Sequence, residues 1–185
     1  MRRINVVGSS GSGKTTTGAE LARRLGVPLV ELDSLSWEPN WVAAPIDVLR
    51  ERVAAAVSGE TWVVDGNYGV ARDLVWARAD TVVWLDLSLW IVMWRVCSRT
   101  VRRLVRREVL WNGNRESMRT TLSRDSIILY ALTEFRRRRR ELSSALAAQP
   151  HLGVVRLTTA GDVERFLAAI PTPASMQPGT RRAQR

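Results

Sequence analysis

Short apolar runs alternate with amphipathic stretches along most of the chain. Five runs of strand length lie at residues 4–7, 28–32, 61–64, 81–87 and 154–157. Segments with the apolar spacing of helices lie at 14–25, 45–57, 72–78, 89–107, 122–148 and 162–170. The run at 81–87 is apolar almost throughout, as is typical of a strand covered on both faces. Strands that alternate with helices predict an α/β fold, in which a five-stranded parallel sheet is flanked by helices.

The ends of the predicted strands carry glycine or aspartate. Gly8 follows the first strand, Asp33 and Asp65 follow the second and third, and Asp86 lies near the end of the fourth. Ligands of open parallel sheets bind at the carboxyl ends of the strands. We therefore expect these residues to border a binding site.

The segment GSSGSGKT, residues 8–15, lies between the first strand and the first helix and fits G-x-x-x-x-G-K-[ST], the phosphate-binding loop. In such a loop, backbone N–H groups and the N-terminal end of the helix surround the phosphates of a nucleotide. Lys14, the only lysine in the chain, is expected to reach the β- and γ-phosphates, and the Thr15 hydroxyl is expected to hold Mg²⁺. The predicted nucleotide contacts here are Gly8, Ser9, Ser10, Gly11, Ser12, Gly13, Lys14, Thr15 and Thr16.

Length and composition limit what this loop can serve. We predict one domain over residues 1–170 and a disordered basic tail over 171–185, which has three prolines and no apolar periodicity. The single Cys97 excludes an internal disulfide, and the single His151 argues against a histidine-based triad or a zinc site. No apolar run has the length of a membrane span, and the first strand begins too early for a signal peptide. A cytoplasmic enzyme is expected.

The formal net charge of +10 indicates anionic partners. Nucleic acid is one class of partner with that property. However, the arginines concentrate in the two long helical segments and in the tail. An enzyme that binds a triphosphate also needs several arginines around one cleft, so the charge favours neither interpretation alone.

The order of these segments resembles the adenylate-kinase-like family of small P-loop kinases. The resemblance rests on the phosphate loop, the strand-end aspartates, a long arginine-bearing helix, a polar loop and a second long helix, and it extends to about residue 170. The runs ELDSLSW, WVVDGNYG and LWNGNRES further resemble a bacterial subgroup labelled topology modulation protein. The resemblance implies a P-loop NTPase fold with a short arginine-rich lid at about 108–121.

The resemblance also implies roles for residues beyond the phosphate loop. Asp65 is expected to orient water on the Mg²⁺ that Thr15 holds, with a cap of the following turn as its structural alternative. For Asp86, a helix cap is the favoured interpretation. Arginines of the helix after the fourth strand are expected to contact the ATP phosphates, and two lid arginines to stabilise charge during transfer. These arginines are Arg95, Arg99 and Arg103 on the helix, and Arg115 and Arg119 in the lid.

Asp33 bears most directly on the reaction. Transfer to a phosphate oxygen needs no general base, whereas transfer to a hydroxyl benefits from a nearby carboxylate. At its strand end, Asp33 is either that general base or a cap of the local turn. Trp37 and Trp41 either line a pocket for the acceptor or pack as a hydrophobic cover over the sheet. The arginines that hold an acceptor phosphate in monophosphate kinases are absent from the positions just after Asp33 and after Asp65-Gly66. Their absence favours an acceptor with a hydroxyl group.

These observations predict an ATP- and Mg²⁺-dependent kinase with Lys14, Asp33, Arg115 and Arg119 as its catalytic residues. The acceptor stays open between a nucleotide or nucleoside and a hydroxyl-bearing metabolite. The alternative is a nucleic-acid-associated ATPase or a polynucleotide 5′ kinase. The preference for ATP over GTP and the oligomeric state stay open as well.

Overall fold

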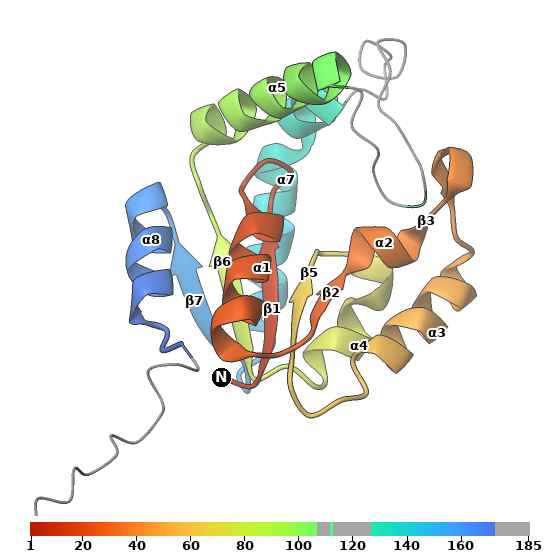
Figure 1. The fold of residues 1–185 in the computed structure, drawn as a ribbon, viewed down its shortest axis with the longest axis vertical. Helices are drawn as coiled ribbons and strands as arrows, with labels where there is room; N and C mark the ends of the chain where they lie inside the picture. The colour runs from red at the N-terminus through yellow and green to blue at the C-terminus, as the bar shows by residue number, and fades with distance from the viewer. Residues whose placement is uncertain (107–111, 113–126, 173–185) are drawn as a thin grey trace, which may run out of the picture.

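The computed structural model describes residues 1–106, 112 and 127–172. Its main sheet has five strands in the order β2-β5-β1-β6-β7, and every neighbouring pair is parallel (Figure 1). The strands are β1 (Arg3–Gly8), β2 (Leu29–Glu31), β5 (Trp62–Asp65), β6 (Thr81–Leu85) and β7 (Gly153–Leu157). The predicted α/β class and the five-stranded parallel sheet are confirmed.

Two layers of helices cover the sheet, as the alternation of side chains along each strand requires. The helices that cover or border it are α1 (Lys14–Leu25), α3 (Ile46–Ala56), α4 (Arg72–Trp76), α5 (Leu89–Arg106), α7 (Ile127–Ala147) and α8 (Ala160–Ala169) (Figure 1). Val6 belongs to a buried cluster with residues of α1 and α8, while its neighbour Val7 belongs to a cluster with residues of α3, α4 and α7.

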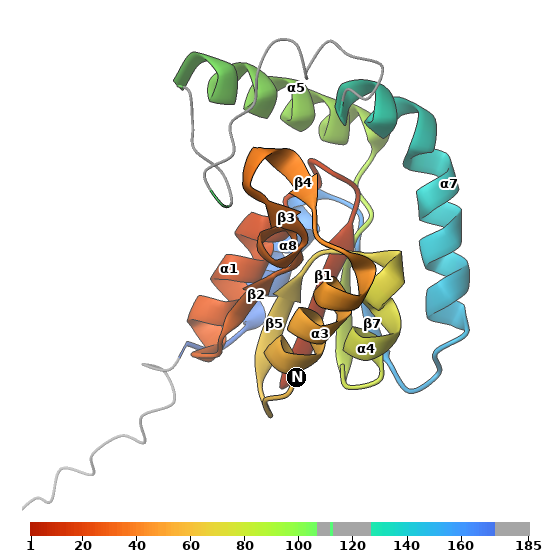
Figure 2. The same cartoon turned by 90° about the vertical axis from the view of Figure 1, so that its right-hand side faces the viewer.

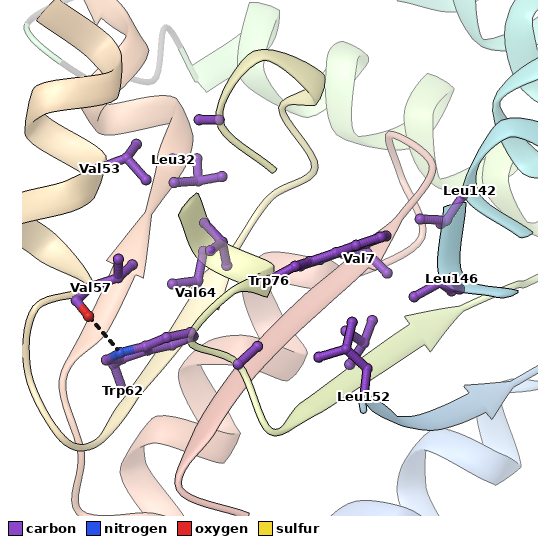
Figure 3. Close-up of a cluster of buried hydrophobic side chains, with 14 of the residues drawn as sticks. Val7, Leu32, Val53, Val57, Trp62, Val64, Trp76, Leu142, Leu146 and Leu152 are labelled. Atoms are coloured by element: carbon purple, nitrogen blue, oxygen red, sulfur yellow. Dashed lines mark hydrogen bonds between the residues drawn. The ribbon is translucent and has the colours of Figure 1, made fainter. Parts of the chain in front are cut away.

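The larger cluster contains three buried tryptophans, Trp62, Trp76 and Trp84, and Figure 3 labels the first two. Trp62 of β5 is 1% exposed, and its indole nitrogen donates a hydrogen bond to the Val57 carbonyl at 3.2 Å. Trp76 of α4 packs against Val7, and its indole nitrogen donates to the Asn5 side chain at 2.9 Å. The indole N–H groups of Trp62 and Trp76 thus each have an acceptor, so these two large side chains add apolar burial without an unpaired donor.

The helix ends follow from local chemistry. Helix α1 ends at Gly26, which has φ 66°, a left-handed conformation that favours glycine. Helix α8 begins with a capping box, in which Thr159 accepts from the Asp162 backbone and the Asp162 carboxylate accepts from the Thr159 backbone. The predicted start of α8 at residue 162 was therefore two residues late, because Asp162 caps the first turn from inside it.

The segment after β2 differs from the prediction. Strand β2 ends at Glu31, and residues 32–36 form a short helix, α2 (Leu32–Ser36), so Asp33 lies in the first turn of a helix and not at a strand end. A small hairpin of β3 (Trp37–Glu38) and β4 (Val42–Ala43) follows, joined by the 3₁₀ turn Pro39–Trp41. In both ribbon views this hairpin lies toward the end of the molecule that α5 occupies (Figure 2).

Most of the predicted lid, residues 108–121, lies outside the described residues, as does the tail from 173 onward. Asn112 is described, and its side-chain amide donates a hydrogen bond to the Trp37 carbonyl. Over the stretches 1–106 and 127–172, no helix combines the length and the apolar character needed to cross a membrane.

Candidate active site

The phosphate loop joins β1 to α1 and packs tightly under α5. Gly11 has φ 81°, and a Cβ atom at this position would lie 2.5 Å from Val96 Cγ2 and 2.9 Å from the Val92 carbonyl oxygen. Gly13 has φ 96°, and its Cβ would lie 3.1 Å from Arg95 Nη1. The positive φ therefore favours glycine at both positions, and at Gly11 the close approach of α5 requires it as well.

Lys14 occupies the centre of the charged groups around this loop. Its ammonium group donates to the Ser9 carbonyl at 3.0 Å. Desolvation lowers the pKa of Lys14, attraction to Asp65 and Asp33 opposes that shift, and repulsion from Arg99 and Arg138 adds to it. Two carboxylates and two guanidinium groups thus act on the one lysine of the motif.

Helix α5 presents arginines to the loop. Arg95 Nη1 donates to the Ser12 carbonyl at 2.9 Å, and Arg99 Nη2 donates to Ser10 Oγ at 3.3 Å. Arg103 lies one turn beyond Arg99 on the same helix, and its side chain is outside what the structure describes. Arg95 and Arg99 therefore both contact the phosphate loop, and their contact with ATP stays a prediction.

Asp65 ends β5 beside the start of α1. It is 7% exposed, its carboxylate accepts a hydrogen bond from the Thr15 side chain, and its Oδ1 atom is buried without a hydrogen-bond partner. Burial raises the pKa of Asp65, and the Lys14 charge and the Thr15 hydrogen bond oppose the rise. An orphaned buried carboxylate oxygen next to Thr15 fits a site for a hard cation.

Such a site needs few protein ligands. No group of three or more His, Cys, Asp and Glu side chains that could hold a metal occurs among the described residues. Mg²⁺ in kinases is bound through one or two side chains, with phosphate oxygens and water completing its shell. The Thr15 and Asp65 pair is consistent with that kind of coordination.

Asp33 faces the loop from α2 and is held by a residue that the sequence reasoning did not assign. Tyr68, in the turn after β5, donates its phenol hydrogen to Asp33 Oδ1 at 2.6 Å. Burial and the Asp33 charge raise the pKa of Tyr68, so its hydroxyl stays a donor across the neutral range. Tyr68 belongs to the WVVDGNYG run, and that run was the available signal for its importance.

No family model matches the chain, but two curated relatives do. A shikimate kinase from Synechococcus sp. (strain CC9902) is 31% identical over 140 residues, which is 70% of this chain and 73% of the relative. The chain belongs to the shikimate-kinase-like family of small P-loop kinases. A shikimate kinase from Sulfurihydrogenibium sp. (strain YO3AOP1) is 29% identical over 124 residues, or 59% of this chain and 75% of that relative. The chain is an ATP-dependent phosphotransferase, as its motif predicted.

Solved structures bear out the fold of the kinase. Shikimate kinase from Bacteroides thetaiotaomicron has a TM-score of 0.56 at 14% identity, with 90% of this chain and 94% of that chain covered. Shikimate kinase from Acinetobacter baumannii in complex with shikimate has a TM-score of 0.56 at 18% identity, with 91% and 89% covered. A gluconokinase from Sinorhizobium meliloti 1021 has a TM-score of 0.51 at 20% identity, with 90% and 91% covered. The resemblance to small P-loop kinases is confirmed at this level, while the topology modulation subgroup stays a prediction.

The predicted catalytic arginines of the kinase, Arg115 and Arg119, lie outside the described residues. Within the arginine run at 136–140, the Arg138 charge acts on Lys14, and Arg139 forms an ion pair with Asp86. Helix α7 thus brings its middle arginines toward the sheet.

Asp86 has a different role from the helix cap expected for it. The buried carboxylate accepts from Arg139 of α7, with Nε 2.7 Å from Oδ1, and from Arg156 of β7, with Nε 2.8 Å from Oδ2. The Arg156 guanidinium also lies over the Trp84 ring, 4.7 Å from its centroid. Asp86 therefore ties α7 to the edge of the sheet.

Two further arginines border the turn after β5. Arg72 donates to the Asn67 side chain at 3.0 and 3.2 Å and lies over Trp76, 5.1 Å from the ring centroid. Burial and the Arg138 charge lower the pKa of Arg72, and the Glu141 charge opposes that shift. Arg50 is bound to Asp73 at the surface. Arg138 thus acts electrostatically both on Arg72 and on Lys14.

Proposed function

We propose that the kinase transfers the γ-phosphoryl group of ATP to a hydroxyl group of a small metabolite, with Asp33 as the general base. The observation that carries this proposal is the carboxylate of Asp33, which acts electrostatically on Lys14 across the site. A carboxylate near the γ-phosphate position is useful to a hydroxyl acceptor, which must lose a proton, and unfavourable for an acceptor that is already a phosphate.

In this reaction the acceptor O–H bond breaks and its proton passes to Asp33, while the acceptor oxygen forms a bond to the γ-phosphorus. The bond between that phosphorus and the bridging oxygen breaks, and ADP leaves. Lys14 and the loop N–H groups stabilise the charge that moves onto the β- and γ-phosphate oxygens. Mg²⁺, held by Thr15 and by Asp65 through water, would neutralise part of the same charge.

The proposal also assigns roles to arginines of α5 and of the predicted lid. Arg99 and Arg103 would bind the triphosphate from α5, and Arg115 and Arg119 would stabilise the transferring group from a lid at 108–121 in a kinase domain of residues 1–170. The hydrogen bond from Asn112 to the Trp37 carbonyl supports an approach of this lid to the β3–β4 hairpin. We also assign the chain to the topology modulation subgroup on the three sequence runs that it shares.

The relatives narrow the acceptor class. The curated relatives are named as shikimate kinases, and one structural neighbour as a gluconokinase. Shikimate and gluconate, the compounds in these names, are both polyhydroxylated carboxylic acids. Arg72 and Arg138 near the site suit a carboxylate group, so we propose a hydroxylated carboxylate as the acceptor.

The test is ADP release with Mg²⁺-ATP across hydroxylated carboxylates, neutral sugars, nucleosides, nucleoside monophosphates and oligonucleotides. The Lys14→Ala variant is the blank, and its thermal unfolding is measured in parallel. Stimulation by hydroxylated metabolites supports the proposal. Stimulation by monophosphates alone excludes the base role of Asp33. Stimulation by oligonucleotides alone favours the nucleic-acid alternative, which a variant without residues 171–185 and a salt titration would then examine.

A further inference from the structure

Tyr68 contacts Asp33 beside the β3–β4 hairpin. Its phenol donates to Asp33 Oδ1 at 2.6 Å, and the side chains of Ser36 and Trp37 lie beside its hydroxyl. Asp33, Ser36 and Trp37 are neighbours in sequence, and the fold brings Tyr68, 35 residues away from Asp33, to them. Trp37 is itself held by Trp41, whose ring lies 5.6 Å away at 79°.

The chemistry of these groups sets the direction of the contact. An indole nitrogen is a donor only, so Trp37 cannot accept the phenol hydrogen of Tyr68. That single hydrogen is directed to Asp33 Oδ1 at 2.6 Å. Asp33 Oδ1 is thereby occupied, and its Oδ2 atom is left to receive a proton from another group.

We propose that Tyr68 is a positioning residue that holds Asp33 by its first oxygen and directs its second oxygen to the acceptor hydroxyl. The inference rests on the proposed base role of Asp33. Asp33 is only partly buried, and the charges of Lys14 and Asp65 act in the same region, so without the tyrosine its carboxylate could rotate toward Lys14. Tyr68 removes that alternative.

If Tyr68 positions Asp33, its loss should lower turnover and leave nucleotide binding unchanged. Tyr68→Phe is expected to lower kcat by about 10-fold, a part of the roughly 10²- to 10⁴-fold that a positioned base contributes, and to leave the KM for ATP within about 2-fold of the wild-type value. Tyr130→Phe, the same change at the other tyrosine of the chain, is the control and is expected to retain wild-type kcat.

A double-mutant cycle of Tyr68 and Asp33 distinguishes a positioning role of Tyr68 from a purely structural one. In the Asp33→Asn background, Tyr68→Phe is expected to cause no further loss of kcat, because the group that it positions is already absent. Equal fold losses in both backgrounds would show that Tyr68 acts independently of Asp33 and would overturn the proposal. If the wild type phosphorylates no acceptor at all, the proposed function fails by itself.

The placement of Tyr68 is also measurable without turnover. In protein with ¹⁵N-labelled tryptophan, the indole signal of Trp37 is assigned with Trp37→Phe. Tyr68→Phe removes the hydroxyl beside this indole and is expected to shift the signal, while Tyr130→Phe leaves it in place. A Trp37 signal that Tyr68→Phe does not move would overturn this placement, and with it the proposal, whether or not an acceptor has been found.

Discussion

Replacement of Asp86 by asparagine should destabilise the kinase by about 2–3 kcal/mol. The Asp86 side chain is 3% exposed and accepts from Arg139 and Arg156, whose side chains are 47% and 49% exposed. A hydrogen bond to a charged group contributes about 1.5–3 kcal/mol, and breaking a fully buried ion pair costs about 3–5 kcal/mol. Because both arginines can be rehydrated at their exposed ends, the lower part of that combined range applies.

Urea denaturation and thermal unfolding measure the effect. For a chain of this length, 1 kcal/mol shifts the melting temperature by about 2–4 °C, so Asp86→Asn should lower it by about 4–12 °C. Asp73→Asn is the matched control, because its ion pair with Arg50 lies at the surface with Asp73 62% exposed. That control should cost less than about 1 kcal/mol. A loss below about 0.5 kcal/mol for Asp86→Asn would refute the reasoning.

The same substitution should reach the active site through α7. Arg139 anchors this helix to Asp86, and its neighbour Arg138 acts electrostatically on Lys14. A looser anchor should therefore raise the KM for ATP in Asp86→Asn, while Asp73→Asn leaves it unchanged. An unchanged KM in a clearly destabilised Asp86→Asn protein would show that the anchor does not support the nucleotide site.

Three further substitutions test the phosphate loop and its surroundings. Gly11→Ala should raise the KM for ATP at least about 10-fold in a steady-state assay, because it places a Cβ atom 2.5 Å from Val96 Cγ2 at φ 81°. Gly18→Ala should stabilise α1 by about 0.5–1 kcal/mol in urea denaturation, since the new Cβ would make ordinary contacts, the nearest at 3.5 Å from Leu29 Cδ1. Asp65→Asn should abolish transfer yet raise the melting temperature of the metal-free protein at neutral pH. Because the folded pKa of Asp65 is raised, the folded state binds more protons than the unfolded state between the ordinary carboxyl pKa and the raised one. Wild-type stability therefore falls as pH rises through that window, and melting curves of the asparagine variant should lack this component.

The sheet was predictable because its strands are short apolar runs bounded by turn residues. The run 28–36 was not, because a three-residue strand and a five-residue helix are both too short to show a period. The prediction extended the strand through Leu32, which is 2% exposed but belongs to α2. Asp33 was consequently assigned to a strand end, although its place beside the phosphate loop was anticipated.

The site residues likewise fall into those that the sequence predicts and those that it does not. The phosphate-loop residues follow from a local motif, whose spacing is itself the physical requirement. Tyr68 and Asp33 are 35 residues apart, and Asp86 and Arg156 are 70 apart, so no local pattern pairs them. Asp86 read alone suits a helix cap, and only the folded chain shows the two arginines that take up its charge.

The contrast between the two carboxylates supports the separate roles that we propose for them. Asp65 is buried beside Thr15 with one oxygen unpaired, and its natural partner is a cation that arrives together with the nucleotide phosphates. Asp33 is only partly buried and has its first oxygen occupied by Tyr68. An acceptor must enter from solvent and leave as a phosphorylated product in every cycle, so its base has to be reachable in the open enzyme. Exchange of the two roles would place the base where no metabolite can reach it and the metal where Tyr68 already occupies an oxygen.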